Sequence, residues 1–429
     1  AHQFGNTQTG DLWDALESTS GQPVRDLMDR WIFQPGHPAL DIRRDGERVV
    51  LDQELFRYRA EDPGDGSWPV PAIIRTGDGE HRLIVEDATE IAVGDTAFVV
   101  GNGGGHGFYR TVYDRASYAA VLENLSALAP LERFALVDDT TALVLRGDMG
   151  LGDAMALVER LADTGESDTH VWQQTLALTG LIARVVIDRP DARVHAGWDA
   201  WLADTLAPVL EAIGVDTSPD DGPLRRELRG ALVAALDDVA HPMANEVATA
   251  TFDADMAGTA VDPAMAAAAL RSVARRATAD QFDAIIDRFR RGATPQVQLR
   301  ALYAAARVQD AGLFDRYLDL AGSDAVRSQN LAFAGRAALS NPVHGARAWT
   351  WLVEGWPALD ERMPFNSWHR LLEGITSVTD RSLAEAIAAH LDAHPIPQAV
   401  QPVAQHRERM WVSVALAERL GADIDGRFA

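Results

Sequence analysis

The sequence contains neither cysteine nor lysine. The lack of cysteine excludes disulfide bonds, cysteine nucleophiles and thiolate metal sites, and it leaves the redox compartment open. All 39 basic residues are therefore arginines, which excludes a P-loop lysine, a kinase-type phosphate lysine and a Schiff-base lysine. The formal net charge of -24 at pH 7 would repel a phosphate backbone, so we expect no nucleic-acid partner.

Long apolar runs are also missing, because arginine and aspartate interrupt the hydrophobic positions every few residues. No stretch approaches the roughly 20 apolar residues that a membrane helix needs, so we expect no membrane partner. A chain of 429 residues with 47% hydrophobic residues fits two or three globular domains. It begins with Ala1 and lacks the features of a signal peptide, so we expect a fragment whose natural start is missing.

Two short helices are predicted at the start of the chain. Thr9 can cap a helix over residues 11–17, and a second helix is expected over 22–33. Their inner faces are expected to carry Trp13, Leu16, Leu27 and Trp31. An exposed indole sacrifices about 2 kcal/mol of burial, so we expect that an upstream segment covers this hairpin.

Short alternating runs follow from residue 38, separated by turn signals such as Gly77-Asp78-Gly79. These runs are 40–43, 48–58, 70–75, 81–86, 97–100 and 108–113. Six or seven strands in so short a segment predict a small β-sandwich.

The pattern becomes helical from about Ser117 to the end of the chain. Predicted helices include 118–127, 152–162, 172–187, 194–212, 223–239, 263–276, 279–290, 295–309, 313–321, 324–339 and 381–394. Their lengths and short polar breaks indicate stacked helix pairs without a strict repeat. The predicted fold is therefore mainly α with a small β domain: a helical hairpin over 1–37, a β-sandwich over 38–115 and an irregular, HEAT-like α-solenoid over 116–429.

Two patterns imitate binding motifs. The glycine-rich run 101–107 follows a strand, but the last glycine of a dinucleotide fingerprint would fall on His106 and no helix follows, so we interpret the run as a loop. His390 and His394 have the spacing of a zinc-binding helix. However, Leu391 stands where that motif needs glutamate and Pro395 ends the helix, so we expect a solvated helix end.

The acidic pairs are interpreted in the same way. Neighbouring residues do not face each other on a helix or strand, so we expect solvated turns and helix ends at Asp138-Asp139, Asp220-Asp221 and Asp237-Asp238. No G-x-S-x-G elbow is present, so a serine hydrolase of the α/β type has no visible nucleophile.

Three segments carry residues at characteristic spacings. The first, from Phe4-Gly5-Asn6 to Pro38, carries Asp11-Leu12-Trp13, Trp31, Gln34, Gly36 and Pro38. The second carries Asn102, Gly107 to Arg110, Thr111, Tyr113 and Asp114. The third, in the helical part, carries Val326 to Asn330, Asn341-Pro342, Gly345, Ala348-Trp349, Trp356, Leu359 and Arg362.

Together these segments resemble aminopeptidase N-type zinc metalloenzymes of the gluzincin family. The first is similar to the end of the family's catalytic domain, and the second to the strand that closes its β-sandwich, with Thr111 in place of the usual valine. The third is similar to a segment of its helical part, with Asn330 in place of an acidic residue.

The resemblance implies the C-terminal portion of an enzyme that removes N-terminal residues from peptides with a zinc ion. The family's His-Glu-x-x-His helix, third glutamate ligand, Gly-x-Met-Glu-Asn loop and oxyanion tyrosine are absent from this sequence. We therefore expect no catalytic, cofactor-binding or metal-binding residue in this chain, and we expect zinc only in the parent enzyme. The expected partners are the N-terminal catalytic half and peptide substrates, and a cytoplasmic location is the usual one for bacterial relatives.

The expected role of this chain is to limit access to the active site and to hold the far end of a peptide. Arg327 and Arg336 are candidates to meet a peptide carboxylate, although a structural ion pair is the commoner role of such arginines. Tyr109 and Arg110 are expected to serve packing and strand pairing. A stand-alone helical-repeat scaffold that binds proteins, and one half of a split aminopeptidase, remain alternatives.

Overall fold

The computed structural model describes residues 5–61, 64–218 and 220–429. Ala1 and Phe4, which entered the sequence interpretation, lie outside the described residues. The chain divides into two compact units, residues 1–146 and 147–429. The prediction of a mainly α chain with small β-sheets near its start is confirmed, whereas the three-domain division stays a prediction.

The first unit begins with the helical hairpin of α1 (Thr9–Ser20) and α2 (Val24–Ile32). The N-cap of α1 is Gln8 and not Thr9, because the Asp11 carboxylate accepts the Gln8 backbone N–H at 2.8 Å and closes a capping box. Gly21, in the left-handed region with φ of 68°, ends α1. Arg25 of α2 then joins the two helices through an ion pair with Asp14 at 2.5 Å.

Two sheets follow the hairpin. The strands are β1 (Pro38–Asp45), β2 (Arg48–Leu55), β3 (Val70–Thr76), β4 (Glu80–Val85), β5 (Thr89–Ala92), β6 (Val99–Val100) and β7 (Arg110–Tyr113). One sheet has the order β5-β2-β1-β7, in which β1 and β7 are parallel, and the other has the order β4-β3-β6. Both contribute apolar side chains to one core, with Leu40 and Leu51 from the first sheet and Val70 and Ile74 from the second. The short strand β5 was not predicted.

Helices α3 (Arg115–Glu123) and α4 (Pro130–Arg146) complete the first unit, with the 3-10 turn η2 (Leu125–Ala127) between them. Helix α4 is tied to the sheets by buried charges. Its Glu132 accepts the guanidinium of Arg75 and the backbone N–H of Gly104. The expectation of a solvated turn at Asp138-Asp139 is wrong, because both residues lie within α4 and pair with Arg110.

The second unit is helical. Its helices are α5 (Leu151–Asp163), α6 (Thr169–Ile187), α7 (Ala192–Ile213), α8 (Pro223–Asp238), α9 (Pro242–Met256), α10 (Pro263–Arg275), α11 (Ala279–Arg291), α12 (Pro295–Ala305), α13 (Ala311–Gly322), α14 (Ser328–Leu339), α15 (Gly345–Glu354), α16 (Trp356–Arg362), α17 (Trp368–Leu372), α18 (Arg381–Ala393) and α19 (Val400–Phe428), with the 3-10 turns η3 (Glu373–Ser377) and η4 (Pro397–Ala399).

Several helix starts are explained by local chemistry. Asp168, Asp262 and Asp380 each accept backbone N–H groups as N-caps, and proline opens α8, α9, α10 and α12. Several predicted boundaries are wrong: α12 ends at Ala305 rather than at 309, α14 begins at Ser328 rather than at 324, and α3 ends at Glu123 rather than at 127.

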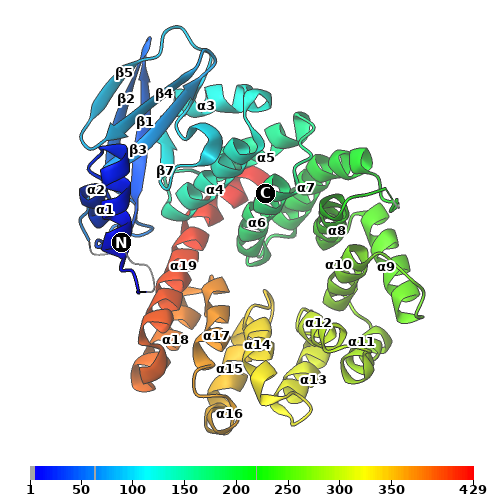
Figure 1. Cartoon of the computed structure of the whole chain (residues 1–429). Coiled ribbons are helices and arrows are strands. Elements are labelled where there is room, and N and C mark those ends of the chain that lie inside the picture. Colours follow the sequence, from blue (N-terminus) through cyan, green and yellow to red (C-terminus); the bar gives the residue numbers. More distant parts are fainter. Residues whose placement is uncertain (1–4, 62–63, 219) are drawn as a thin grey trace. The chain divides into compact units, whose positions relative to one another are not determined.

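The helical array of the second unit closes on itself through its last helix (Figure 1). The end of α19 reaches α6 and α7, where Asp425 pairs with Arg189 and the ring of Phe428 lies 6.1 Å from that of Trp198. Ser413 of α19 also donates to the Thr376 carbonyl at 2.7 Å. Helix α19 thus packs against helices from both ends of the unit. Among the described residues, no helix is long and apolar enough to cross a membrane.

Candidate functional site

The described residues offer no zinc site. No group of three or more His, Cys, Asp or Glu side chains among them could hold a metal ion. The imidazoles of His390 and His394 are stacked at 4.2 Å with 21° between their planes, so they meet face to face rather than converging on one ion. The described residues therefore do not fit the zinc ion that the resemblance implies for the parent enzyme.

The expectation of a solvated helix end holds for His394 but is wrong for His390. His394 is exposed, whereas His390 is half-buried and lies T-shaped against Trp356 at 4.8 Å. The acidic pair Asp237-Asp238 is likewise not solvated throughout, because Asp237 is fully buried and pairs with Arg276 at 3.1 Å.

An exposed set of large apolar side chains marks the first unit. It consists of Leu12, Leu16, Ile32, Phe33 and Phe108, which we call the hairpin apolar surface, and their exposed fractions range from 44% to 78%. Leu12 and Leu16 share one face of α1 because they are four residues apart, and Ile32 and Phe33 lie at the end of α2. The expectation that Leu16 lies on an inner face is wrong.

Trp31 connects Phe108 of this surface to the core of the unit. Its indole N–H donates to the Pro69 carbonyl at 3.1 Å, and its ring lies 6.2 Å from Trp68 and 6.2 Å from Phe108. Phe108 is nevertheless 71% exposed. Trp68 is completely buried. Trp31 packs against it and Phe108 packs against Trp31, so both rings are held in place by the core.

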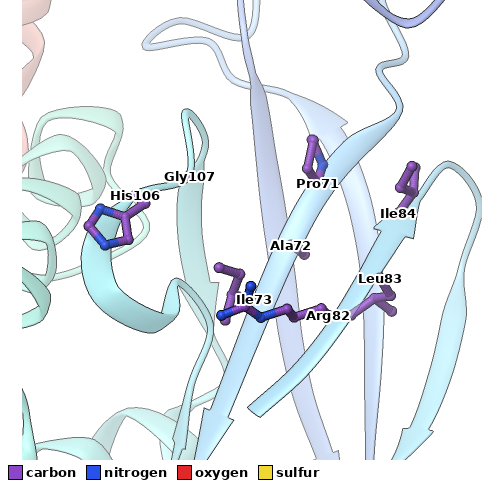
Figure 2. Close-up of a pocket in the computed structure, with 8 residues that line it drawn as sticks. All are labelled: Pro71, Ala72, Ile73, Arg82, Leu83, Ile84, His106 and Gly107. Atoms are coloured by element: carbon purple, nitrogen blue, oxygen red, sulfur yellow. The ribbon is translucent and has the colours of Figure 1, made fainter. Parts of the chain in front are cut away.

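A shallow hollow of about 490 Å³ lies on β3, β4 and the segment before β7. Figure 2 shows Pro71, Ala72 and Ile73 of β3 and Arg82, Leu83 and Ile84 of β4 on one side, with His106 and Gly107 on the other. Ile84 is 53% exposed. The hollow is mostly apolar, and Arg82 and His106 are the polar side chains that line it.

The first two family motifs have structural roles. Gln34 donates to the Arg30 and Ser67 carbonyls, and Gly36 has a φ of 91° and leaves only 2.6 Å between an added Cβ and Leu55. In the second motif, the Asn102 amide exchanges hydrogen bonds with Gly107 at 2.8 and 3.1 Å, and the buried Tyr109 hydroxyl donates to the Gly101 carbonyl. The glycine-rich run is thus a self-bonded loop.

The third motif holds helix junctions together. The buried Asn341 amide donates to the Ala306 and Val308 carbonyls at 2.8 and 3.0 Å. Arg362 donates to the Ser323 and Val326 carbonyls at 2.8 and 3.2 Å. Both side chains hydrogen-bond carbonyl groups at or just beyond the ends of helices, which have no partner within the helix. These motif positions therefore hold neighbouring helices together and are not free to bind a ligand.

A group of aromatic and charged side chains on α12, α14, α17 and η3 is the best candidate for a ligand contact in the second unit. It consists of Tyr303, Phe333, Arg336, Arg370 and Glu373, which we call the Phe333 cluster. The guanidinium carbons of Arg336 and Arg370 lie 5.4 and 5.6 Å from the centre of the Phe333 ring, and the Tyr303 ring lies 6.4 Å from it.

The charges of this cluster do not balance. Arg336 pairs with Glu373 at 2.6 Å, as expected for a structural arginine, but Arg370 is exposed and its guanidinium has no hydrogen-bond or ion-pair partner in the described part of the chain. Burial raises the pKa of Tyr303, and the charge of Arg336 opposes that shift, so the phenol is neutral at physiological pH. One unpaired positive charge beside a half-buried phenyl ring suits a ligand that combines a carboxylate with an apolar group.

Sequence reasoning named Arg336 but missed Phe333 and Arg370. Phe333 and Arg336 are three residues apart on α14, a spacing that places them on one face. Arg370 comes from α17, which was not predicted as a helix. The other candidate, Arg327, is exposed and lies at the N-cap of α14 without a side-chain partner among the described residues.

Comparison with known proteins defines the class of this chain. The model of the ERAP1-like C-terminal domain family matches residues 98–410, which is most of the chain. The chain therefore belongs to the ERAP1-like C-terminal domain family. The resemblance to the C-terminal portion of aminopeptidases is thereby confirmed.

Individual relatives agree with this family. The chain is 31% identical over 263 residues to the Tricorn protease-interacting factor F2 of Thermoplasma acidophilum, a match that covers 60% of this chain and 31% of the relative. It is 27% identical to aminopeptidase M1-C of Oryza sativa, with 84% of this chain and 43% of the relative covered. It is 24% identical to the glutamyl aminopeptidase of Bos taurus, with 85% and 39% covered. The chain thus spans less than half the length of these relatives.

Proposed function

We propose that this chain is the C-terminal, non-catalytic portion of a zinc aminopeptidase that removes N-terminal residues from peptides. In this proposal, the zinc ion and the catalytic groups belong to an N-terminal portion of the same enzyme. The hairpin apolar surface would dock on that portion, and the helical unit would restrict access to the active site. The relatives named aminopeptidase support the class of reaction.

The hairpin apolar surface is the observation that carries this proposal. Phe33 and Phe108 are 78% and 71% exposed, and burying a phenylalanine side chain stabilises a complex by roughly 1.5–3 kcal/mol. Such a concentration of exposed apolar side chains marks a protein interaction site. A free-standing scaffold has no need of this surface at its helical hairpin, so the observation favours an enzyme portion over the scaffold alternative. The cytoplasmic location stays a prediction.

The docking step is tested by association with the N-terminal catalytic portion, expressed separately. Phe33→Asp and Phe108→Asp are each expected to weaken association by at least about tenfold, because a charge replaces about 1.4 kcal/mol or more of apolar burial. Phe365→Asp is the matched control, because Phe365 is 75% exposed but lies in the helical unit. Equal effects of all three substitutions would contradict docking through the hairpin apolar surface.

We further propose that the Phe333 cluster contacts the far end of a peptide substrate. Arg370 would bind a carboxylate, and Phe333 would support the adjoining side chain. The unpaired guanidinium of Arg370 and its position 5.6 Å from the Phe333 ring support this assignment. Because the cluster lies in the helical unit, this contact would depend on peptide length.

A further inference from the structure

Helix α18 is held against α15, α16 and α17 by five aromatic side chains: Trp349, Trp356, Trp368, His390 and His394. We call this group the aromatic joint. The indole rings of Trp356 and Trp368 are stacked at 3.9 Å with 19° between their planes. His390 lies edge-on to Trp356 at 4.8 Å and to Trp349 at 5.5 Å, and its other face is stacked on His394 at 4.2 Å.

The two imidazoles differ in their hydrogen bonds. The Nδ1 atom of His394 lies 3.0 Å from the His390 carbonyl oxygen, and the ring itself is exposed to solvent. The Nε2 atom of His390 is buried and has no hydrogen-bond partner among the described residues. A neutral ring tolerates this position better than a charged one, because it carries no net charge to be solvated. A protonated ring would carry a buried N–H without an acceptor.

The carboxylates near the joint are committed elsewhere. Asp360 of α16 accepts the Trp368 indole N–H at 2.7 Å, and Asp392 of α18 pairs with Arg407 of α19 at 2.8 Å. The remaining ionisable side chains of α15 to α18 are Arg347, Glu354, Glu361, Arg362, His369, Arg370, Arg381 and Glu385, and those of α19 are His406, Glu408, Arg409, Glu418, Arg419, Asp423, Asp425 and Arg427. The pKa of His390 is lowered by burial and by the charge of His394.

We propose that the aromatic joint is an acid-sensitive contact, in which a positive charge on His390 separates α18 from α15, α16 and α17. The charge of His394, whose ring is stacked on His390 at 4.2 Å, disfavours a charged His390 in the closed joint. The buried N–H of His390 would gain a water partner only if α18 moved outward. Because α18 leads through η4 into α19, which closes the helical array, this movement would loosen the closure.

The direction of the pH effect follows from linkage. A His390 pKa below the ordinary 6.5 means that the folded protein binds fewer protons than the unfolded chain. The joint therefore makes its full contribution to the free energy of unfolding above pH 6.5. This contribution is lost as the pH falls through the lowered pKa of His390. Each unit by which the pKa is lowered corresponds to about a tenfold change in the opening equilibrium.

The test is hydrogen exchange of residues 381–393 in the full chain, measured at about pH 7.5 and about pH 5 and corrected for intrinsic exchange rates. Opening of α18 is expected to be greater at the lower pH, because a charged His390 is disfavoured in the closed joint. His390→Phe keeps a ring but cannot titrate, so its opening is expected to change little with pH. His170→Gln, which alters an exposed histidine on α6, is expected to behave as the parent chain.

A second variant covers the case in which His390→Phe does not fold. His394→Ala removes the neighbouring charge, so the pKa of His390 measured by NMR is expected to rise toward 6.5. A pKa of His390 at or above 6.5 in the parent chain would overturn the proposal. Equal pH dependence of α18 in the parent chain and in His390→Phe would overturn it as well.

Discussion

The Asp139 carboxylate of α4 accepts two hydrogen bonds from Thr111 of β7, one from the backbone N–H at 2.9 Å and one from the hydroxyl at 2.5 Å. Both residues are buried. Thr111 stands where the resemblance leads us to expect valine, and this departure from the motif has a local partner in Asp139. The pair joins β7 to α4 within the first unit.

Thr111→Val is therefore expected to destabilise the first unit by about 1–3 kcal/mol, because Asp139 loses a hydroxyl donor in a buried place. Urea unfolding followed by fluorescence measures the change. Thr141→Val is a suitable control, because the Thr141 hydroxyl bonds only to the Val137 carbonyl within α4. A free energy of unfolding that is the same for Thr111→Val as for the control would contradict the role of the pair.

Asp139 also predicts a pH dependence. Burial raises the pKa of Asp139 from 3.8 to about 6, although Thr111 and Arg110 act to lower it. The pKa of Asp139 is thus higher in the folded protein than in the unfolded chain. The protonated acid therefore makes its full contribution to the free energy of unfolding below about pH 3.8, and this contribution is lost as the pH rises through about 6. Relative to Asp139→Asn, the parent chain is expected to lose about 3 kcal/mol over this window. A difference in free energy of unfolding between the parent chain and Asp139→Asn that does not change with pH would contradict this prediction.

The closure of the helical unit is expected to depend on the last turn of α19. Phe428→Ala removes the contact with Trp198 and is expected to cost about 1–3 kcal/mol, because the lost side chain is partly buried. Hydrogen exchange of residues 420–428 is expected to accelerate. Val400→Ala, at the exposed start of α19, should leave hydrogen exchange of this segment unchanged. Faster exchange in both variants would contradict a specific role of the contact between Phe428 and Trp198.

The Phe333 cluster predicts a kinetic effect in the complete enzyme. Arg370→Ala is expected to raise the KM for peptides with a free terminal carboxylate by about tenfold or less, the value of an exposed charge-assisted contact. The KM for aminoacyl anilides, which are too short to reach the cluster, is expected to stay constant. Arg271→Ala provides an exposed arginine on α10 as control. An equal effect on both substrate classes would contradict a contact with the far end of the peptide.

The sequence predicts regular elements better than it predicts burial of charge. Alternating runs and turn glycines located β1 to β4, because hydrophobic alternation is a local signal. The neighbouring pairs Asp138-Asp139 and Asp237-Asp238 look like solvated turns, yet Asp139 and Asp237 are buried. Their partners, Thr111 and Arg276, lie far away in the sequence, so no local pattern could identify them.

The candidate contacts show the same limit. Arg336 could be proposed as a ligand contact because it lies on a predicted helix. Arg370 comes close to the same Phe333 ring only because α17 packs against α14. The hairpin was predicted correctly as two helices, and its two tryptophans suggested a covered surface. The side chains that are exposed, Phe33 and Phe108, come from a helix end and from a loop. Their exposure depends on how the loop before β7 meets α2.

The non-catalytic role of this chain is tested by hydrolysis of leucyl and alanyl anilides by the purified chain, with and without added zinc. We expect no turnover in either condition, because the described residues bring together no three metal ligands and the sequence carries none of the family's catalytic motifs. Addition of the N-terminal catalytic portion should then give the activity that this chain lacks. Zinc-dependent release of amine by the chain alone would show that this chain is itself catalytic.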